Sequence, residues 1–519
     1  MRRLSLAAAG VVVLVAIAGQ SAAREHASGG PSAVFALIIG VNASPDPDVR
    51  PLQYADDDAA RYLDLFRALG ARTYLLTRLD ENTRRLHPQA AAEAQPARRE
   101  DLQRAVAALA RDVAQARARG VRSVLYVIYA GHGDVRDEKP YLTLEDGRLE
   151  GPALISEIVG PAAADQNHLI IDACQAYLLA FQRGPGGTRR AVHGFVELEA
   201  ASRNGRIGYL LSSSATGETH EWAGFEAGVF SHEVRSGLYG AADADGDGVV
   251  TYTELAAFVT RANADIVSAR FRPQIVARAP AGGDALLDLR SRAGRQMRFD
   301  GPDADAHYLL EDAQGVRLLD FHGGAHAPVH LVRPAVVGPL YLRRVADGAE
   351  RTIQPGDAVV QLDALPVEPA RAAVRGAAQH AFNTLFAEPF DGAAVTQYEA
   401  SAAAQLQIQD EGDRRDTRAR RLRVAAWSAW GTAGAAAIVA GVLELSARSL
   451  HDVPMTDTQV QTVARNQEIA TRNHVAIGLA IGAGVAAATG LVFWNAARQA
   501  TVGAAVTPDG ASVSLAFRF

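Results

Sequence analysis

The sequence predicts an α/β fold with a mostly parallel sheet flanked by helices, followed by a small all-β module and two transmembrane helices. Two apolar, β-branched runs, 124–129 and 168–171, lie between segments of helical periodicity, a pattern typical of buried parallel strands. Beyond residue 297, short alternating runs recur between turns, which indicates a β-sheet module. Two Gly/Ala-rich apolar stretches near the C-terminus approach the ~20 residues that cross a bilayer.

The composition bounds the number of domains and the class of partner. At ~150 residues per domain, 519 residues imply about three units, and a hydrophobic content of 48% can fill a large core. The net charge is −6 and the isoelectric point is near 6.2. These values give no general case for nucleic-acid binding, so no nucleic-acid partner is expected.

Residues 1–23 have the three regions of a secretory signal peptide. Arg2 and Arg3 are positive, residues 6–18 are apolar, and residues 21–23 form a small-residue cleavage site. The apolar run is shorter than the ~20 residues of a spanning helix, although an uncleaved anchor is the alternative. The sequence therefore predicts an exported chain.

The two central strands each end at a residue that can do chemistry. His132, between two glycines, follows the first strand, and Cys174 follows the second. Function collects past the carboxyl ends of parallel strands. Because Cys174 is the only cysteine, no intrachain disulfide is possible, and a lone cysteine with a histidine is a candidate nucleophile–base pair. The alternative is a buried structural cysteine and a loop histidine bonded to backbone.

These residues resemble the motifs of a known family. The segments Tyr129-Ala130-Gly131-His132-Gly133 and Asp172-Ala173-Cys174 resemble the His-Gly and Asp-x-Cys motifs of caspase-like cysteine peptidases, in particular the bacterial metacaspase-like branch. The resemblance covers residues 34–290 and implies a caspase-like fold. Where metacaspases continue Cys-His-Ser-Gly, this chain has Cys174-Gln175-Ala176-Tyr177, a departure beside the substrate pocket.

The resemblance implies a role for each residue of the candidate site. His132 is the general base, Cys174 attacks the scissile carbonyl, and the backbone N–H groups of Gly133 and Cys174 form the oxyanion hole. Asp172 lies two residues before the nucleophile, so its side chain points to the same face of the strand. A carboxylate there can anchor a basic substrate side chain, the role that the resemblance implies. Alternatively, Asp172 caps the strand end or orients His132.

The rest of the first domain reads as alternating strands and helices. The three acids at 56–58 are interpreted as a solvated helix N-terminus favoured by the macrodipole, with a functional site as the less favoured alternative. Residues 85–97 are Ala/Pro-rich and are expected to form a loop. Strands are predicted at 34–42, 72–77 and 207–214, helices at 52–69, 98–119, 154–159 and 228–239, a hairpin at 141–147, and sheet-closing strands at 272–276 and 285–289.

Residues 243–254 match a calcium-binding EF-hand loop. Calcium needs hard oxygen ligands, a glycine at the tight bend and a closing bidentate glutamate. Val249 would contribute its backbone carbonyl at position 7, and Gly248 stands at position 6. The alternative is an acidic turn without an ion. The side-chain ligands at positions 1, 3, 5, 9 and 12 are Asp243, Asp245, Asp247, Thr251 and Glu254.

The C-terminal part is expected to hold a β module at 297–365, a helical linker at 366–423, and a β-hairpin at 499–519. Transmembrane helices are predicted at 424–445 and 474–494, with a buried soluble hairpin as the alternative. The signal peptide would place the catalytic domain in the periplasm, whereas the Arg-rich segment before the first span favours the cytoplasm. The signal peptide decides the prediction, because its three regions are in order.

The sequence thus predicts an exported, membrane-anchored cysteine endopeptidase with one calcium ion, which cleaves protein or peptide substrates after Arg or Lys. The alternative from a different class is a catalytically silent caspase-like scaffold that binds partner proteins. A soluble calcium sensor fits poorly with one loop and two apolar spans.

Overall fold

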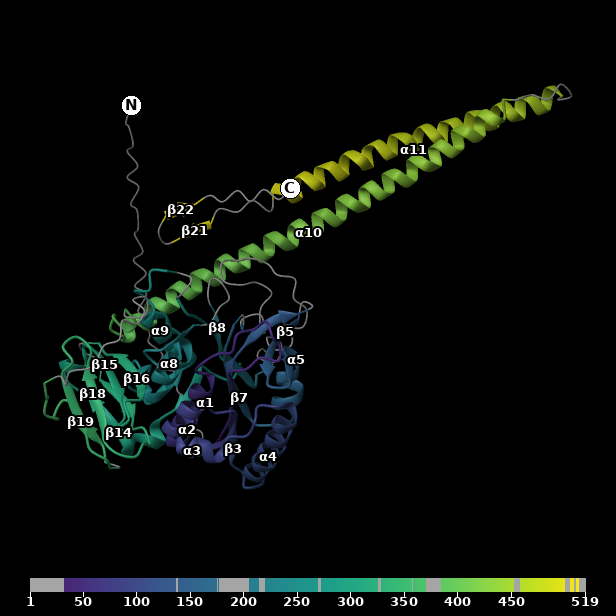
Figure 1. Ribbon diagram of the computed structural model, residues 1–519. Coiled ribbons are helices and arrows are strands. Elements are labelled where there is room, and N and C mark those ends of the chain that lie inside the picture. Colours follow the sequence, from purple (N-terminus) through teal and green to yellow (C-terminus); the bar gives the residue numbers. More distant parts are fainter. Residues whose placement is uncertain are drawn as a thin grey trace, which may run out of the picture. The chain divides into compact units, whose positions relative to one another are not determined.

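The computed structural model divides into two compact units, residues 1–399 and 400–519, which are described separately (Figure 1). The structure describes residues 32–136, 139–174, 176, 205–213, 220–268, 272–324, 328–356, 358–369, 384–451, 458–499, 505–507 and 510–512. The predicted signal peptide lies outside these residues.

A six-stranded sheet forms the centre of the first unit, in the order β12-β8-β7-β3-β1-β2. All neighbours are parallel except β12, which runs antiparallel to β8 at one edge. This arrangement confirms the predicted mixed α/β fold with a mostly parallel sheet. The strands are β1 (Ser32–Val41), β2 (Arg72–Thr77), β3 (Arg122–Gly131), β7 (Gln166–Ala173), β8 (Ile207–Ser213) and β12 (Gln274–Arg278).

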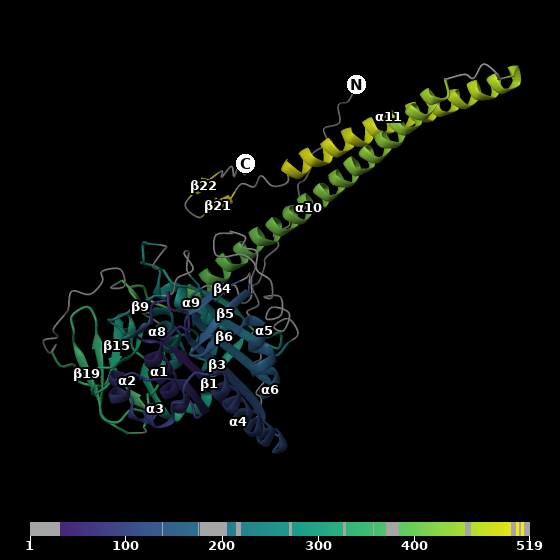
Figure 2. The ribbon, with the colours of Figure 1, turned by 45° about the vertical axis from the view of Figure 1, so that its right-hand side comes forward.

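Helices cover both faces of this sheet (Figures 1 and 2). Alternate residues of a strand point to opposite faces, so one strand feeds two cores. Ala36 and Ile38 of β1 join the core that contains α1 (Ala55–Ala68), whereas Leu37 and Ile39 join the core that contains α4 (Arg99–Ala118). The first core also takes in α8 (Val229–Ser236) and α9 (Tyr252–Ala262).

The expected loop at 85–97 is wrong in part, because the chain forms α2 (Glu81–Leu86) and α3 (Pro88–Glu93) there. Asp80 caps α2 by accepting a hydrogen bond from the Thr83 N–H at 2.8 Å. Pro88 stands in the first turn of α3, where its missing N–H has no intrahelical role. The helices are short, and this is why a helical period was not visible.

The expected closing of the main sheet by two strands is half wrong. β12 joins the sheet, but β13 (Ala285–Asp288) pairs instead with β11 (Val249–Thr251), the strand inside the acidic loop. A second small sheet contains β4 (Gly133–Arg136), β5 (Lys139–Leu144) and β6 (Gly147–Glu150). Short elements complete this part of the chain: α5 (Gly151–Ala153), π-helical η1 (Leu154–Val159), α6 (Gly160–Ala162), β9 (Glu221–Trp222), β10 (Ala227–Gly228) and η3 (Gly237–Ala241).

The β module packs onto the first domain through a continuous core. Phe321 and Leu319 of the module share one buried cluster with Phe66 of α1 and Phe258 of α9. The module and the first domain are therefore one compact unit. The module's two sheets have the orders β17-β14-β20 and β16-β15-β18-β19. Its elements are η4 (Arg290–Arg295), β14 (Gln296–Phe299), η5 (Pro302–Ala304), β15 (His307–Glu311), β16 (Arg317–His322), β17 (Val329–Val332), β18 (Leu340–Arg344), β19 (Glu350–Ile353) and β20 (Val360–Gln361).

Two long helices, α10 (Gly392–Ser449) and α11 (Gln459–Gln499), dominate the C-terminal part. The predicted helical linker at 366–423 is wrong in its first part, because α10 begins only at Gly392 and the described residues 366–369 and 384–391 are not helical. From Gly392 onward, α10 continues without a break into the first predicted span. The segments Arg418–Ser449 and Gln459–Arg498 are long and apolar enough to cross a membrane. Residues beyond them include β21 (Ala505–Thr507), which pairs antiparallel with β22 (Gly510–Ser512).

The two helices of the second unit lie antiparallel and bury one residue every seven positions, which is small at every position except Ile469. The Trp430 Nε1–H donates to the Ala487 carbonyl at 3.3 Å, and a Cβ added to Gly490 would lie 2.3 Å from that nitrogen. A seven-residue period is the spacing of a coiled-coil seam, and small residues let two backbones approach closely. The buried positions are Ala419, Ala426, Ala433, Ala440 and Ala447 on α10, and Ile469, Ala476, Ala483, Gly490 and Ala497 on α11.

Candidate active site

The sheet brings His132 and Cys174 to one edge. β3 and β7 are neighbouring parallel strands, and the last residues of each, Gly131 and Ala173, are paired directly. His132 and Cys174 therefore each stand one residue beyond paired strand ends. This is the carboxyl edge of a parallel sheet, where binding sites of α/β proteins form.

Gly133 brings the backbone after the histidine against the cysteine. A Cβ added at Gly133 would lie 2.7 Å from the Cys174 carbonyl oxygen and 3.0 Å from the Ala173 Cβ. Such contacts are too short for any side chain, so only glycine permits this approach. The main chains of Gly133 and Cys174, the two predicted oxyanion-hole residues, are thus neighbours.

Tyr129 fixes the backbone at the histidine. Its buried hydroxyl lies 2.7 Å from the His132 carbonyl and 3.0 Å from the Thr143 nitrogen. The Thr143 N–H also donates to the His132 carbonyl at 3.0 Å. A Cβ at Gly131 would lie 2.6 Å from the Tyr129 hydroxyl, so this glycine makes room for the network.

The surroundings of His132 favour the neutral imidazole. Burial lowers its pKa from the ordinary value of 6.5, and backbone groups of Asn42 and Arg50 partly oppose the shift. The buried Nε2 of His132 has no hydrogen-bond partner within the described part of the chain. A neutral imidazole can accept a proton, as a general base must.

Cys174 is the only cysteine of the chain, so its thiol forms no intrachain disulfide, and the residue is partly exposed. Partial exposure suits a nucleophile, since a reagent must reach the sulfur. The altered motif after the cysteine falls mostly outside the described residues, which include Ala176 but not Gln175 or Tyr177.

Asp172, the predicted substrate-binding residue, is 7% exposed, and only one of its two carboxylate oxygens is bonded by the described residues. Its Oδ2 accepts hydrogen bonds from the Ser231 N–H at 3.1 Å and from the Ser231 hydroxyl at 2.8 Å. Its Oδ1 is buried and has no partner among the described residues. Burial raises the pKa of Asp172, and hydrogen bonds from Ser231 oppose the shift. A buried carboxylate with an open acceptor can bind a cationic group.

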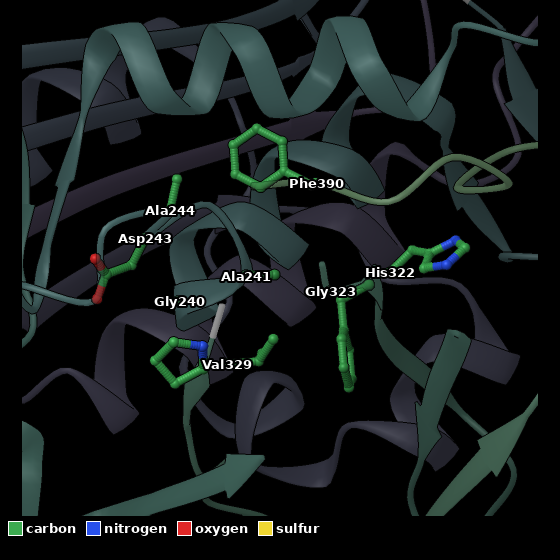
Figure 3. Close-up of a pocket in the computed structure, with 10 residues that line it drawn as sticks. Gly240, Ala241, Asp243, Ala244, His322, Gly323, Val329 and Phe390 are labelled. Carbon is green, nitrogen blue, oxygen red and sulfur yellow. The ribbon is translucent and has the colours of Figure 1, made fainter. Parts of the chain in front are cut away.

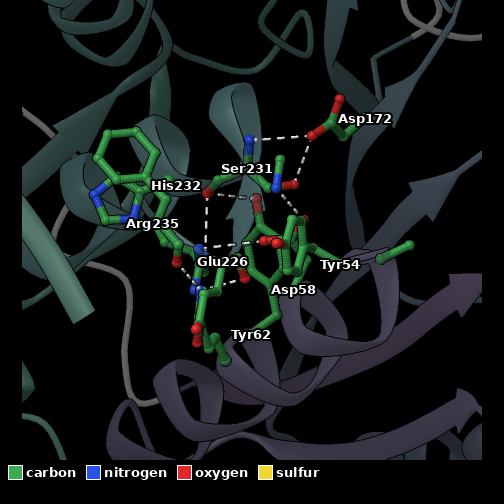
Figure 4. A network of polar contacts seen from close by, with 12 residues as sticks. Tyr54, Asp58, Tyr62, Asp172, Glu226, Ser231, His232 and Arg235 are labelled. Atoms are coloured by element: carbon green, nitrogen blue, oxygen red, sulfur yellow. Dashed lines mark hydrogen bonds and ion pairs between the residues drawn. The ribbon is translucent and has the colours of Figure 1, made fainter. Parts of the chain in front are cut away.

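A second carboxylate, Asp58, lies beside Asp172 and was not predicted as part of the site. A Cβ added at Gly228 would lie 2.8 Å from the Asp172 Oδ2 and 3.0 Å from the Asp58 Oδ2. Asp58 pairs with the buried Arg235 guanidinium at 3.2 Å and accepts the Gly228 N–H at 2.8 Å (Figure 4). Because Arg235 already occupies Asp58, the open acceptor of this pair of carboxylates is Asp172 Oδ1.

The interpretation of residues 56–58 as a solvated helix start is therefore wrong. All three side chains are at most 2% exposed. α8 covers the start of α1, and Asp56 is held by Asn42 Nδ2 at 2.6 Å and by the Asp80 N–H at 2.8 Å. Three successive acids at the start of the helix that follows β1 were the available signal.

The acidic loop has the geometry that a cation requires. Ligand oxygens of Asp243, Asp245 and Asp247 lie within 4.8 Å of one another. Gly248, at the predicted bend, has a φ of +82°, which favours glycine. Asp243 is 6% exposed, and its Oδ1 is buried without a partner in the described chain. A buried carboxylate oxygen of this kind is a suitable ligand for a cation, so the residues present fit calcium.

The other predicted calcium ligands also lie at this loop. Glu254 Oε2 accepts hydrogen bonds from the Thr251 N–H at 2.9 Å and the Thr251 hydroxyl at 2.8 Å, and Glu254 Oε1 accepts the Ala244 N–H at 3.1 Å. The Val249 N–H donates to Asp247 Oδ1 at 2.7 Å. The loop is thus folded on itself, with Glu254 closing it across Ala244.

A small pocket separates the acidic loop from the β module (Figure 3). Asp243 lies at one edge and His322 of β16 at another, while Phe390 and Val329 provide apolar walls. Neither His132 nor Cys174 lines it. The loop therefore borders the module, away from the thiol and the imidazole.

The fold and the site define a mixed α/β protein with a thiol and an imidazole at the carboxyl edge of a mostly parallel sheet. No protein-family model matches the sequence, and no curated protein matches it. Among solved structures, the chain is similar to caspase-1 from Spodoptera frugiperda, at 11% identity and a TM-score of 0.30, over 48% of this chain and 87% of that chain. It is also similar to a pro-sf-caspase-1 structure, at 11% identity and a TM-score of 0.28, over 48% of this chain and 93% of that chain.

Proposed function

We propose that the chain is a caspase-like cysteine endopeptidase of the metacaspase-like kind, acting on protein or peptide substrates. The pairing of Gly131 with Ala173 carries the proposal, because it puts His132 and Cys174 at adjacent positions of one sheet edge. A neutral histidine beside a thiol is the arrangement that activates a cysteine nucleophile.

In the proposed reaction, His132 takes the proton of the Cys174 thiol, and the thiolate attacks the scissile carbonyl carbon. The oxyanion that forms accepts hydrogen bonds from the backbone N–H groups of Gly133 and Cys174. The imidazolium returns its proton to the leaving amine as the C–N bond breaks. Water then hydrolyses the thioester, with His132 again acting as the base.

Fluorogenic peptides ending in Arg, Lys or Asp test this function directly. We expect turnover of the Arg and Lys peptides, because Asp172 has an open carboxylate oxygen that a cationic side chain can occupy. Absence of turnover with every peptide, with and without calcium, would instead favour the catalytically silent scaffold.

Activity is expected to persist below the ordinary titration range of histidine. Burial lowers the pKa of His132 below 6.5, so the neutral base survives to lower pH and is lost only as the pH falls through this lowered value. The acidic limb of kcat/KM against pH should therefore have its midpoint below 6.5. A midpoint at or above 6.5 would contradict the assignment of His132 as the base in this environment.

We further propose that the 243–254 loop binds one Ca²⁺. The carboxylates of Asp243, Asp245, Asp247 and Glu254 would hold the ion, together with Thr251 and the Val249 carbonyl. Bound calcium would supply positive charge that fixes this acidic loop. The support is the buried, unpartnered Asp243 Oδ1 at the centre of the loop.

Calorimetry is expected to find one calcium ion per chain and a Kd that rises by about 100-fold or more in Glu254→Gln, which loses the charge of the closing ligand. Glutamine keeps the length of Glu254, and its one carbonyl oxygen can still accept the two hydrogen bonds from Thr251, whereas the Ala244 N–H loses its acceptor. Asp312→Asn is the matched control, because Asp312 also accepts backbone N–H groups of its own turn but lies outside this loop. Equal calcium binding by wild type and Glu254→Gln would disprove the site.

We also propose that the chain is exported and anchored in the bacterial membrane, with the catalytic domain in the periplasm. The two apolar helices support an anchor. Apolar side chains project from both of them, including Ile438, Leu445 and Leu491, each more than three-fifths exposed. In a bilayer these side chains would contact lipid tails instead of water.

The mature protein is expected to stay in the membrane fraction after alkaline washing and to begin at residue 24. Mass spectrometry of the purified N-terminus reads the second point, and an intact Met1 would favour an uncleaved anchor. Cys174 is the only thiol, so a membrane-impermeant maleimide reports its compartment. Labelling only after lysis of the inner membrane would place the domain in the cytoplasm.

A further inference from the structure

A fully buried carboxylate of the β module, Asp320 in β16, holds several groups at once. It lies 2.8 Å from His232 Nε2 and 2.7 Å from His307 Nε2, and it accepts the Arg317 Nε–H at 2.6 Å. Its own backbone N–H donates to the Ser236 hydroxyl at 3.0 Å. Burial would raise the pKa of Asp320, but Arg317 and the two imidazoles outweigh it and keep the pKa well below its ordinary value. A charge buried so deeply persists only with such partners.

Two of these partners belong to α8, the helix that also binds the carboxylates of Asp172 and Asp58. His232 and Ser236 face Asp320, while Ser231 binds Asp172 and Arg235 binds Asp58 (Figure 4). All eight residues of α8 are buried. In a helix of two turns these four side chains are rigidly linked, so a shift of His232 or Ser236 also shifts Ser231 and Arg235.

A second set of contacts ties the same module to the turn before α8. The Arg317 guanidinium lies 4.7 Å above the Phe225 ring, and Phe225 stacks on His232 at 3.9 Å. The Phe225 carbonyl accepts the Arg61 guanidinium at 2.6 Å. Three residues later, Gly228 lies against the Asp172 and Asp58 carboxylates. The turn and the helix are therefore both positioned by the module.

We propose that Asp320 is a positioning residue for substrate recognition, through which the β module fixes α8 and sets the position of Asp172. Asp320 is not a catalytic residue, because its carboxylate is fully buried and no substrate can reach it. The inference rests on the proposed function, since it assigns the module a part in recognising a basic substrate side chain. It gives the module a role that no motif in its sequence indicated.

The two histidines on Asp320 provide a matched pair of variants. His232→Leu and His307→Leu each remove one imidazole from Asp320, but only His232 belongs to α8. We expect His232→Leu to raise KM for an Arg peptide and the Kd of benzamidine, a small cation, by about tenfold or more, since small displacements at a site have large effects. The kcat and the rate of Cys174 alkylation by iodoacetamide should change less than about twofold, because the sheet edge is untouched.

His307→Leu should bind benzamidine and the Arg peptide like the wild type. His232→Gln, which keeps an N–H donor, should restore most of the affinity, and Ser236→Ala offers a milder break on the same face of α8. All variants are tested in the full chain.

Several results would overturn the inference. Equal effects of His232→Leu and His307→Leu, or a loss of alkylation in step with the loss of affinity, would show a merely structural role. Wild-type affinity in both His232→Leu and Ser236→Ala would refute the positioning role alone, provided that the wild type binds benzamidine and cleaves Arg peptides. A wild type that does neither would overturn the proposed function and this inference together.

Discussion

Replacing Cys174 with alanine is expected to lower peptide hydrolysis by at least ~10⁴-fold, and His132→Ala should lower it comparably. Cys174→Ala removes the atom that forms the thioester, and His132→Ala removes the base that activates it. The two losses should not add, because nucleophile and base act as one unit. The initial rate with an Arg peptide measures both effects.

Neither substitution is expected to unfold the domain. Cys174 is partly exposed, and the buried Nε2 of His132 has no hydrogen-bond partner among the described residues. Circular dichroism and the melting temperature check this point. His330→Ala is the matched control for loss of an imidazole, because His330 lies in β17 of the module and its ring pairs with Asp300 at 3.3 Å. Retained turnover in either pure site variant would contradict the peptidase assignment.

Asp172→Asn is expected to remove the preference for basic substrates, with kcat/KM for Arg and Lys peptides falling by roughly 10²-fold or more. Asparagine keeps the size of Asp172 and can still accept the Ser231 hydrogen bonds, but it carries no charge. A buried cationic side chain left without its partner costs about 2–5 kcal/mol. Peptides with an uncharged residue at the same position should lose far less.

The rate at which iodoacetamide alkylates Cys174 distinguishes two possible roles of Asp172, which are binding a basic substrate side chain and orienting His132. If Asp172 binds the basic side chain of the substrate, Cys174 in Asp172→Asn should be alkylated at the wild-type rate. If Asp172 instead orients His132, alkylation should slow together with hydrolysis. Asp347→Asn is the control for charge, because Asp347 is half-exposed and bound to Arg344 on the module surface. Efficient wild-type cleavage after Asp, with none after Arg or Lys, would show that the pocket assignment is wrong.

The strand ends that carry the candidate thiol and imidazole could be predicted because the signal is local. Continuous β-branched runs identify buried strands, and a polar residue at the end of such a run falls at the sheet edge. The structure places His132 and Cys174 one residue beyond β3 and β7, as the runs indicated. The runs themselves do not show that the two strands are neighbours, and it is the pairing of β3 with β7 that establishes it.

The burial of Asp58 could not be predicted in the same way, because it depends on distant parts of the chain. The macrodipole explains acids at any helix start, whether solvated or covered. What covers this one is α8, whose Arg235 is 177 positions away along the chain. The same holds for Asp320 and His232, separated by 88 positions. Nothing in the short alternating runs of the module distinguishes a residue that faces its own sheet from one that faces α8.

The C-terminal helices show a different kind of ambiguity. Alanine occupies most of the buried positions of both helices at a spacing of seven residues. A shift of one helix by seven positions would therefore again pair alanine with alanine at most of these positions. Such a shift of register would change little in the packing of these small residues between the two helices. Trp430 distinguishes the registers, because its large ring packs against Gly490, where a Cβ would lie 2.3 Å from the indole nitrogen. The pairing of one large residue, Trp430, with one residue that lacks a side chain, Gly490, therefore favours a single register of the two helices.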